Sequence, residues 1–574
     1  MKMKKYIYLF IFLVSLFLYA CENLLEPVAD TTKVNEEQLM KDPTWLEGLL
    51  INAYASLPNN YNDFNLDVAS DDAVTNLQGS SITSMATGGW RSSVDPISVW
   101  GKDYEMIRHL NLFLEKVDDI IWSLDPRLTT AQNEEKNMYY KRRLKGEAYG
   151  MRAYYMSQLL QYHSGKSADG TLLGFPIITK VISSNDDWKL PRNTFADCVQ
   201  RIMSDLDSAI IKLPAVYADI AGQTMYNAAS GVKFVGRMNG NAARALKARV
   251  ALLAASPAYS ESSGVTWAQA ATIAGDLLKT LGALYPAGKT FYTETSNKEM
   301  IWNQSFVSSR SAEVNSFPPS LFGLGRTNPT QSLVDAFPMK NGYPISHGSS
   351  GYNPANPYNN RDTRLGDYIL FNGSSYKSMV INTYVGAAQD GLGTMETSTR
   401  TGYYLKKFML STVSLTPGSL VSSNHTYTLF RMTEVLLNYA EAANEAWGPT
   451  GDPNAYGFTA KSKIGELRVR AGITAPDPYL QGIIDKAALR VLIRNERRVE
   501  LCFEGFRFWD IRRWENGAVN ITNPATGVQI INNLGVLTYN YLQVEPRIYQ
   551  PFMIYGPIPY NETLKYNLIQ NAGW

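Results

Sequence analysis

The sequence predicts a mainly α-helical fold, with a solenoid-like helical half and a loop-rich half that contains small β elements. Apolar residues recur at three- and four-residue steps over several long segments, which is the period of an amphipathic helix. Alanine alternates with leucine there, as in tetratricopeptide-like helical pairs, which bury their apolar faces on one another. A middle stretch is instead rich in Gly, Asn, Ser, Tyr and Pro, with only short alternating runs.

The helical pattern covers these segments in chain order: 36–57, 99–120, 134–162, 194–213, 241–255, 427–446 and 485–504. The second half of 134–162 mixes small residues, among them Ala148, Gly150 and Ala153, with large apolar ones. Small residues let two helix backbones approach closely, so this helix is expected to pack tightly on a neighbour. The intervals between helices are irregular, and periodicity alone therefore predicts a solenoid-like arrangement rather than a strict repeat.

The N-terminus has the pattern of a secretory signal peptide over residues 1–20. Lysines precede an apolar run of about 14 residues, too short for the ~20 residues of a membrane-spanning helix. Leu18-Tyr19-Ala20-Cys21 resembles a bacterial lipobox, which predicts that Cys21 is acylated and anchors the mature chain. No linker divides the rest, so residues 21–574 are expected to form one composite domain.

Composition excludes several classes of function. Loss of the signal lysines brings the formal net charge from +2 to about −1, which argues against a nucleic-acid partner. Cys198 and Cys502 lie in apolar stretches, where plain buried thiols are commoner than a disulfide. No spacing of Cys or His suits zinc, and no cofactor is expected. No carboxylate run has calcium-loop spacing, but calcium binding by the carboxylate-rich loops stays open. No GxSxG, HExxH or P-loop motif is present.

Glu496, Glu500 and Glu504 recur at four-residue steps among several arginines and are the strongest sign of chemistry. A glycosidase needs two carboxyl groups about 5 to 9.5 Å apart, one of them with a raised pKa. Neighbouring arginines would instead lower the carboxyl pKa values, so ion pairs of structural importance are the better interpretation. Regular spacing among apolar residues likewise predicts packing roles for Trp100, Trp509 and Trp514.

Ligand contacts are expected on ring-bearing loops. The chain has 35 tyrosines and 11 tryptophans but is only 18% charged, and sugars stack on such rings while neutral amides and carboxylates bind their hydroxyls. The polar stretch 58–96 and a loop-rich insertion at about 260–425 are the candidate binding regions. The candidate residues are Trp90, Asp71, Asp72, Asn76, Trp302, Tyr352 and Tyr358. An Asp-Asp pair before a turn is equally typical of an Asx turn or a helix cap.

Three passages carry a resemblance to a known family: 431–442 (RMTEVLLNYAEA), 494–514 (RNERRVELCFEGFRFWDIRRW), and 556–559 (GPIP) with 570–574 (QNAGW). In this order they closely resemble the SusD/RagB family of outer-membrane lipoproteins of Bacteroidetes. Further matches, among them Trp100, Asn111 and the run 361–364, extend along almost the whole mature chain.

The resemblance implies four tetratricopeptide-like helix pairs supporting a less regular half. It also implies a lipid-anchored protein on the outer membrane, facing outward, that captures glycans and delivers them to a SusC-like TonB-dependent transporter. Peptide capture, as in the RagB branch, is the main alternative. A surface glycoside hydrolase and a purely structural or adhesive lipoprotein are further alternatives from other classes. Ring stacking selects sugars in general, so the particular glycan and linkage stay open.

Overall fold

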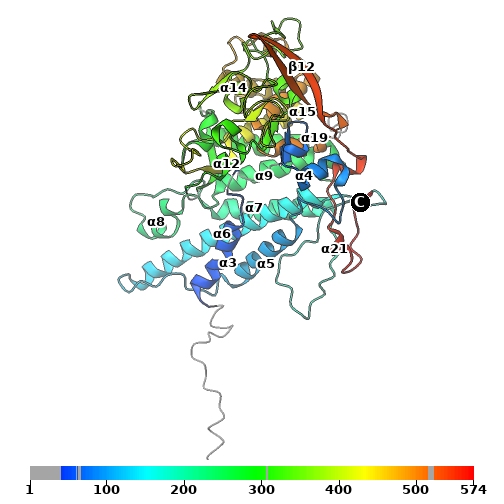
Figure 1. The fold of residues 1–574 in the computed structure, drawn as a ribbon. Coiled ribbons are helices and arrows are strands. Elements are labelled where there is room, and N and C mark those ends of the chain that lie inside the picture. The colour runs from blue at the N-terminus through cyan, green and yellow to red at the C-terminus, as the bar shows by residue number, and fades with distance from the viewer. Residues whose placement is uncertain (1–40, 60, 62–65, 287, 306–307, 515–521) are drawn as a thin grey trace, which may run out of the picture.

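Helices dominate the computed structural model, which describes residues 41–574 apart from 60, 62–65, 287, 306–307 and 515–521. The main helices are α3 (Pro43–Ala55), α5 (Trp100–Lys116), α6 (Thr130–His163), α7 (Phe195–Lys212), α9 (Gly240–Ala255), α11 (Trp267–Leu281), α15 (Met432–Trp447), α16 (Ala460–Arg470), α18 (Lys486–Leu501) and α19 (Phe506–Arg513). They pack in series, α3 on α5, α5 on α6, α6 on α7, α7 on α9, and then α11 between α9 and α15 (Figure 1). The predicted mainly α-helical fold is confirmed.

α6 shows why the sequence forms this stack. The Thr129 hydroxyl accepts from the backbone N–H of Gln132, whose side chain accepts from the backbone N–H of Thr129, and this capping box starts the helix. A Cβ at Gly146 would lie 2.7 Å from Leu213 Cγ at the end of α7, closer than atoms can pack. The small residues of α6 therefore allow the close approach of α7, as the sequence indicated.

α11 corrects the predicted boundary of the loop-rich half. It begins with a capping box on Thr266 and buries Ala274 and Leu278 against its neighbours in the stack. The insertion predicted at about 260–425 is therefore wrong at its start, because 267–281 belongs to the helical half. This helix of 15 residues has an apolar face at helical spacing, which the sequence analysis did not separate from the loop-rich stretch that follows it.

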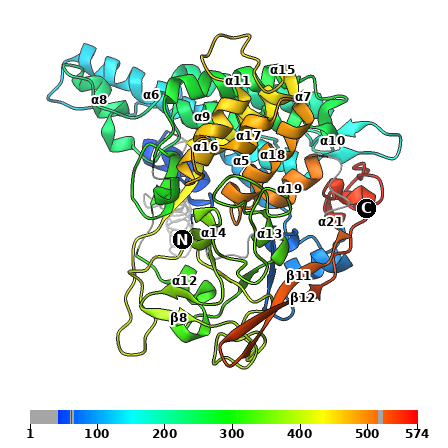
Figure 2. The same ribbon diagram turned by 90° about the horizontal axis from the view of Figure 1, so that it is seen from above.

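The loop-rich half contains small antiparallel sheets of two strands each, as predicted (Figure 2). The strands that matter below are β1 (Ala73–Thr75), β4 (Met300–Ser305), β5 (Thr327–Pro329), β10 (Thr426–Arg431), β11 (Ala525–Asn533) and β12 (Val536–Glu545). β1 pairs with β5, β4 with β10, and β11 with β12. Leu534 and Gly535, with φ of 54° and 92°, join β11 to β12 in the kind of turn that suits a tight hairpin. The sequence analysis missed this hairpin.

The stretch 58–96, expected to be a polar binding loop, contains regular structure among its described residues. It contains the short helices η1 (Leu66–Ala69), α4 (Ser81–Ser84) and η2 (Met85–Gly89) together with β1. Val68 and Met85 are buried in two hydrophobic clusters of the core. The loop interpretation is wrong for the segment 66–89, because β1 is held by β5, a partner some 250 residues away that local periodicity cannot reveal.

A buried network of ion pairs joins the two halves. It is built on Glu496 and Glu500 of α18 and on Glu504, which follows this helix. Glu496 pairs with Arg364 at 2.8 Å and with Arg468 at 2.5 Å. Arg364 belongs to α14 (Thr363–Tyr368) of the loop-rich half, whereas Arg468 belongs to α16. The structural interpretation of these carboxylates is confirmed.

Glu500 and Glu504 extend the same network toward the start of α15. Glu500 lies 2.9 Å from Arg470 and 3.0 Å from Arg431, and Glu504 lies 2.7 Å from Arg431 and 2.8 Å from Lys407. Burial alone would raise the pKa of Glu500, but Arg470, Arg431 and Arg364 hold it below its ordinary value. The charge of each member is thus stabilised only while its partners stay in place.

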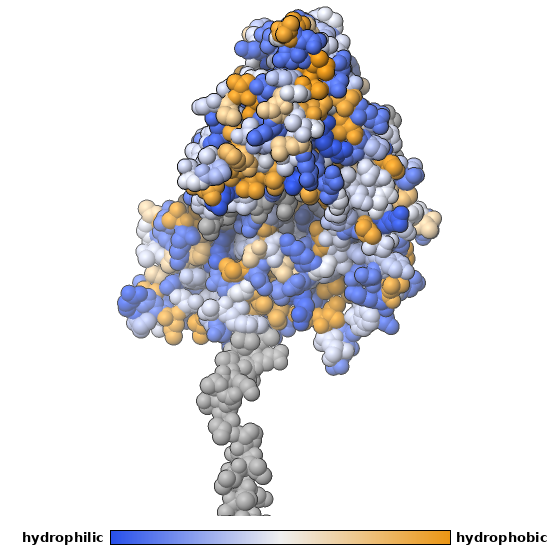
Figure 3. All heavy atoms as spheres, in the orientation of Figure 1, coloured by the Kyte–Doolittle hydropathy of each residue, from blue (hydrophilic) through white to orange (hydrophobic). Residues whose placement is uncertain are grey.

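The predicted signal peptide and the predicted lipidation site, Cys21, both lie outside the described residues. Over the part that is described, no helix combines the length and apolar character needed to cross a membrane. Figure 3 shows hydrophobic side chains scattered among hydrophilic ones over this face of the molecule. Cys198 and Cys502 are both buried free thiols.

We expect the fold to be sensitive to acid because of this network. A carboxylate whose folded-state pKa is lowered contributes stability above the unfolded-state pKa, ~4.3, and that stability is lost as pH falls below it. Thermal unfolding monitored by near-ultraviolet circular dichroism should show a falling midpoint below about pH 5. Glu500→Gln should lower the free energy of unfolding at pH 7 by about 3–5 kcal/mol and flatten the acid dependence. An equal effect of Glu135→Gln, at an exposed position on α6, would contradict this.

Candidate functional site

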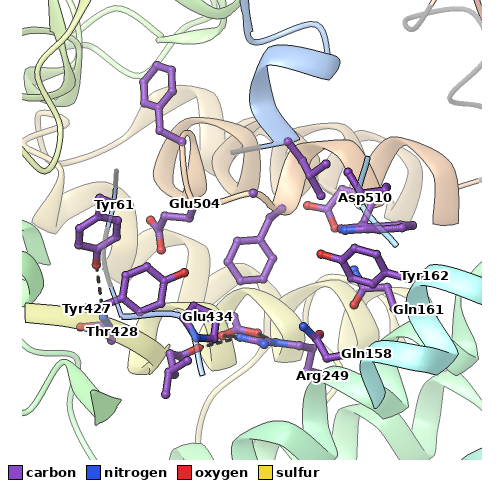
Figure 4. A pocket seen from close by; sticks show the side chains of 18 of the residues that line it. Tyr61, Gln158, Gln161, Tyr162, Arg249, Tyr427, Thr428, Glu434, Glu504 and Asp510 are labelled. Carbon is purple, nitrogen blue, oxygen red and sulfur yellow. Dashed lines mark hydrogen bonds and ion pairs between the residues drawn. The ribbon is translucent and has the colours of Figure 1, made fainter. Parts of the chain in front are cut away.

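A cavity of about 580 Å³ lies between the helical half and the loop-rich half. Its walls come from α6, α9, β10 and the first turn of α15, the end of α18, and α19. Pro58, Tyr61 and Leu66 complete them, with residues of the segments 96–99, 315–316 and 326–327. Figure 4 shows side chains from these separate elements pointing into one open centre. No single segment builds the site.

α6 supplies an uninterrupted polar and aromatic stripe. Tyr154, Gln158, Gln161 and Tyr162 lie at steps of four, three and one residues, which places them on one helix face toward the cavity. Gln158 and Gln161 are half-buried, and neither side-chain amide hydrogen-bonds another group of the described chain. Their donors and acceptors are therefore available to a ligand.

Aromatic rings line both ends of the cavity. Tyr61 stacks on Phe408 with ring centroids 4.0 Å apart, and its hydroxyl accepts from the backbone N–H of Thr428 at 3.3 Å. At the other end, Tyr162 packs on Trp509 at 4.6 Å. Burial raises the pKa of Tyr162 to about 12, so its hydroxyl stays protonated and can donate. Because these contacts fix the rings, they form rigid walls for an apolar ligand face.

The carboxylates that line the cavity are held by arginines. Arg249 forms a two-pronged ion pair with Glu434 at 2.6 and 2.7 Å (Figure 4). Arg497 lies 2.6 Å from Asp510. Burial would raise the pKa of Glu504, but Arg431 and Lys407 hold it below its ordinary value. A general acid needs a raised pKa, so this arrangement suits binding and not glycoside hydrolysis.

None of the seven ligand contacts predicted from sequence lies among the residues that line this cavity. Asp71 receives two bonds from Arg507 at 2.7 and 2.8 Å, and Asp72 receives one from Arg498 at 2.7 Å. Both carboxylates thus hold arginines of α18 and α19 in place. The cap or Asx-turn alternative is also wrong, because the partners are arginines distant in sequence.

Asn76 also serves the fold. Its side-chain amide donates to the backbone carbonyls of Leu324 and Gly325, each at 3.0 Å, and its oxygen accepts from Arg326 at 3.2 Å. Asn76 therefore fixes the loop that precedes β5, beside the cavity but outside its lining.

Trp90 is a core residue, contrary to the expectation that no apolar neighbours surround it. It is 3% exposed, its ring lies 4.8 Å from Trp574 and 5.8 Å from Phe508, and its indole N–H donates to Asp95 at 3.0 Å. One edge borders a smaller hollow of about 350 Å³ that Trp574 also lines. Because Trp90 is almost fully buried, little of its ring surface is accessible for a sugar to stack on.

Trp302 is also part of the core. Its ring is 1% exposed and lies parallel to Phe430 across the β4–β10 pair, with centroids 6.1 Å apart. Its indole N–H donates to the carbonyl of Gly236 at 2.9 Å. Trp302 lies in β4 with its side chain directed into the core, and not on the binding loop that the sequence analysis expected.

Tyr352 and Tyr358 lie half-buried on the loop-rich half, away from the cavity lining. Tyr358 stacks on Phe371 with centroids 4.3 Å apart and approaches Tyr539 of β12 at 6.0 Å. With Tyr541, which is 56% exposed, they make a tyrosine surface beside the hairpin. Their contact with a ligand stays a prediction.

Sequence reasoning missed the residues that line the cavity. Gln158 and Gln161 are uncharged amides within an otherwise apolar helix segment, and a solvated helix face more often has charged residues. These uncharged amides were the sequence feature from which the cavity lining could have been recognised.

The described residues contain no candidate metal site, since no group of three or more His, Cys, Asp or Glu is arranged to hold an ion.

Comparison with known proteins agrees with this architecture. A model of the SusD family matches residues 293–574, and a model described as "starch-binding associating with outer membrane" matches residues 25–250. A SusD-like protein of Formosa agariphila is 25% identical over 562 residues, covering 94% of this chain and 97% of the relative.

Solved structures share the fold. A SusD-like protein of Bacteroides fragilis superposes with a TM-score of 0.74 at 23% identity, covering 94% of this chain and 99% of that one. A SusD-like carbohydrate-binding protein of the same species gives 0.71 at 21% identity, covering 92% and 99%. Surface glycan-binding protein A of Bacteroides fluxus gives 0.58 at 19% identity, covering 94% and 100%.

The position of Trp90 leads to a prediction about stability. Trp90→Ala should lower the free energy of unfolding by about 3–5 kcal/mol, because it removes a buried ring that packs on Phe508 and Trp574. Denaturant unfolding followed by circular dichroism measures this change. Trp188→Ala, which truncates a tryptophan that is 49% exposed, should cost far less. Equal losses in the two variants would show that Trp90 is not a packing residue.

Proposed function

The chain belongs to the SusD/RagB family, and we propose that it captures a glycan in the cavity between its two halves and delivers it to a SusC-like TonB-dependent transporter. Members of this family are binding proteins and not enzymes. Beyond family membership, we propose where the ligand binds, which groups hold it and which partner receives it.

The free amides of α6 are the observation that carries the proposal. Gln158 and Gln161 project into the cavity beside Tyr162, while Tyr427 faces them from β10 (Figure 4). A sugar ring offers an apolar face to such rings and a rim of hydroxyls that exchange hydrogen bonds with amides. Unpartnered neutral amides next to fixed rings are what such a ligand needs.

The size of the cavity also supports capture of a small part of a polymer. A volume of about 580 Å³ lies within the ~300–1,000 Å³ range of ordinary ligand sites. We propose that a few sugar units enter while the rest of the chain stays outside. Two proteins of similar structure are a carbohydrate-binding protein and a surface glycan-binding protein, and they support the same ligand class.

We propose an outer-membrane location with lipid attachment through Cys21. The family description that includes association with the outer membrane supports the location. The lipobox pattern at Leu18-Tyr19-Ala20-Cys21 supports the attachment. A tethered capture protein keeps its ligand near the membrane, where the transporter can receive it.

Glycan capture predicts a loss of affinity when the amides are removed. Calorimetric titration of residues 22–574 with a panel of glycans should identify a ligand, and Gln158→Ala with Gln161→Ala should weaken its binding at least tenfold. That corresponds to about 1.4 kcal/mol, or roughly one hydrogen bond in the site. Gln200→Ala, at an exposed glutamine on α7, is the matched control and should bind like the parent.

The outcome also separates the ligand classes. Binding of peptides without any glycan would keep the capture role but replace the ligand, because amides and rings also recognise an extended peptide. Glycan binding that survives loss of both amides would move the site away from the cavity.

Delivery to a transporter makes a separate prediction. Tagged full-length chain, solubilised in mild detergent from the outer membrane of its native host, should co-purify with a TonB-dependent barrel in near-equal amount. Deleting that barrel should abolish glycan uptake and leave surface binding of the glycan intact. Recovery of the tagged chain alone, with uptake unaffected, would contradict the proposed partner.

A further inference from the structure

Arg326 is the one arginine in the cavity lining without a carboxylate partner among the described residues. The lining contains five arginines and three carboxylates: Arg249, Arg326, Arg431, Arg497, Arg513, Glu434, Glu504 and Asp510. Arginines that are paired with carboxylates present no net charge to a ligand, whereas an unpaired arginine does.

The other four arginines are neutralised at short range. Arg249 pairs with Glu434 at 2.6 Å, and Arg431 pairs with Glu504 at 2.7 Å. The remaining two are paired as tightly. Arg497 lies 2.6 Å from Asp510, and Arg513 lies 2.6 Å from the buried Glu441 behind the wall. Arg326 is therefore the uncompensated positive charge of the described lining.

The β1–β5 ladder determines where this charge stands. Thr75 pairs with Thr327, so Asn76, just after β1, faces Arg326, just before β5. The Asn76 oxygen accepts from Arg326 Nη1 at 3.2 Å, and the Arg326 backbone N–H donates to Asn315 at 2.8 Å. The guanidinium is half-buried and held at one corner, with its other N–H groups available.

We infer that the glycan captured in this cavity carries anionic groups, carboxylates or sulfate esters, and that Arg326 selects for them. The inference rests on the proposed function and specifies its substrate class. A planar guanidinium binds two oxygens of a carboxylate or sulfate through parallel hydrogen bonds. A half-buried position weakens solvent screening, so such a pair is stronger there than on an open surface.

Different parts of the cavity lining are suited to different features of the ligand. The rings and the amides of Gln158 and Gln161 act on features that all sugars share. Arg326, on the opposite half of the molecule, can donate to any sugar oxygen, but its positive charge favours an anionic substituent. A glycan that bridges the cavity from α6 to the loop before β5 would satisfy both.

Two matched pairs of glycans test this inference. Oligogalacturonate is compared with its methyl ester, which lacks the carboxylate charge, and a sulfated galactan is compared with its desulfated form. Calorimetric titration at low and high salt gives each dissociation constant for the parent, Arg326→Gln, Arg326→Lys and Arg91→Gln. Arg91 is exposed, forms no ion pair in the described chain and lies outside the cavity lining, so it controls for loss of one charge.

We expect at least one anionic member to bind the parent tenfold or more tightly than its neutral counterpart, with the advantage shrinking as salt rises. Arg326→Gln should abolish the preference for the anionic member, Arg326→Lys should retain part of it, and Arg91→Gln should keep it whole. Which pair shows the preference distinguishes carboxylate from sulfate. Thermal midpoints of all variants verify that they are folded.

Other outcomes overturn the inference. If glycans bind but show no preference for charge, or if the preference survives in Arg326→Gln, then Arg326 does not select an anionic ligand and the proposed capture function stands. If no glycan of either pair and none of the wider panel binds the parent, then the capture function and this inference fail together.

Discussion

The buried ion pairs along α18 are the constraint on which the rest of the structure depends. Glu496, Glu500 and Glu504 are each buried or nearly so. Glu496 and Glu500 pair with arginines from both halves of the chain, and Glu504 pairs with Arg431 and Lys407. Removing a single partner would leave a charge in a low-dielectric interior, which is costly. The helical half and the loop-rich half are therefore fixed relative to each other, and the cavity between them has fixed walls.

The same pairing principle gives the cavity its chemistry. Arginines hold Glu434, Glu504 and Asp510 as ion pairs, so these carboxylates serve as structure and not as proton donors. What remains to meet a ligand is neutral and aromatic, the amides of Gln158 and Gln161 and the rings around them, with Arg326 as the one uncompensated charge of the described lining. A site of this composition can hold a sugar without cutting it.

The sequence predicted the helical stack well and the surroundings of the candidate site residues poorly, for a physical reason. Helix periodicity and the packing of small residues such as Gly150 are local, and they can be read from the chain. The position of Trp90 depends on Trp574 and Phe508, and that of Asp71 depends on Arg507, contacts that span more than 400 residues. Polarity alone placed Asp71 and Asp72 in a binding loop, when long-range arginines required them as ion-pair partners.

Location of the ligand tests the central claim most directly. A crystal structure of residues 22–574 with a bound oligosaccharide should show sugar density within hydrogen-bonding distance of Gln158 and Gln161, with a ring face against Tyr162 or Tyr427. Density confined to the tyrosine surface formed by Tyr352, Tyr358, Tyr539 and Tyr541, with only water in the cavity, would contradict the account.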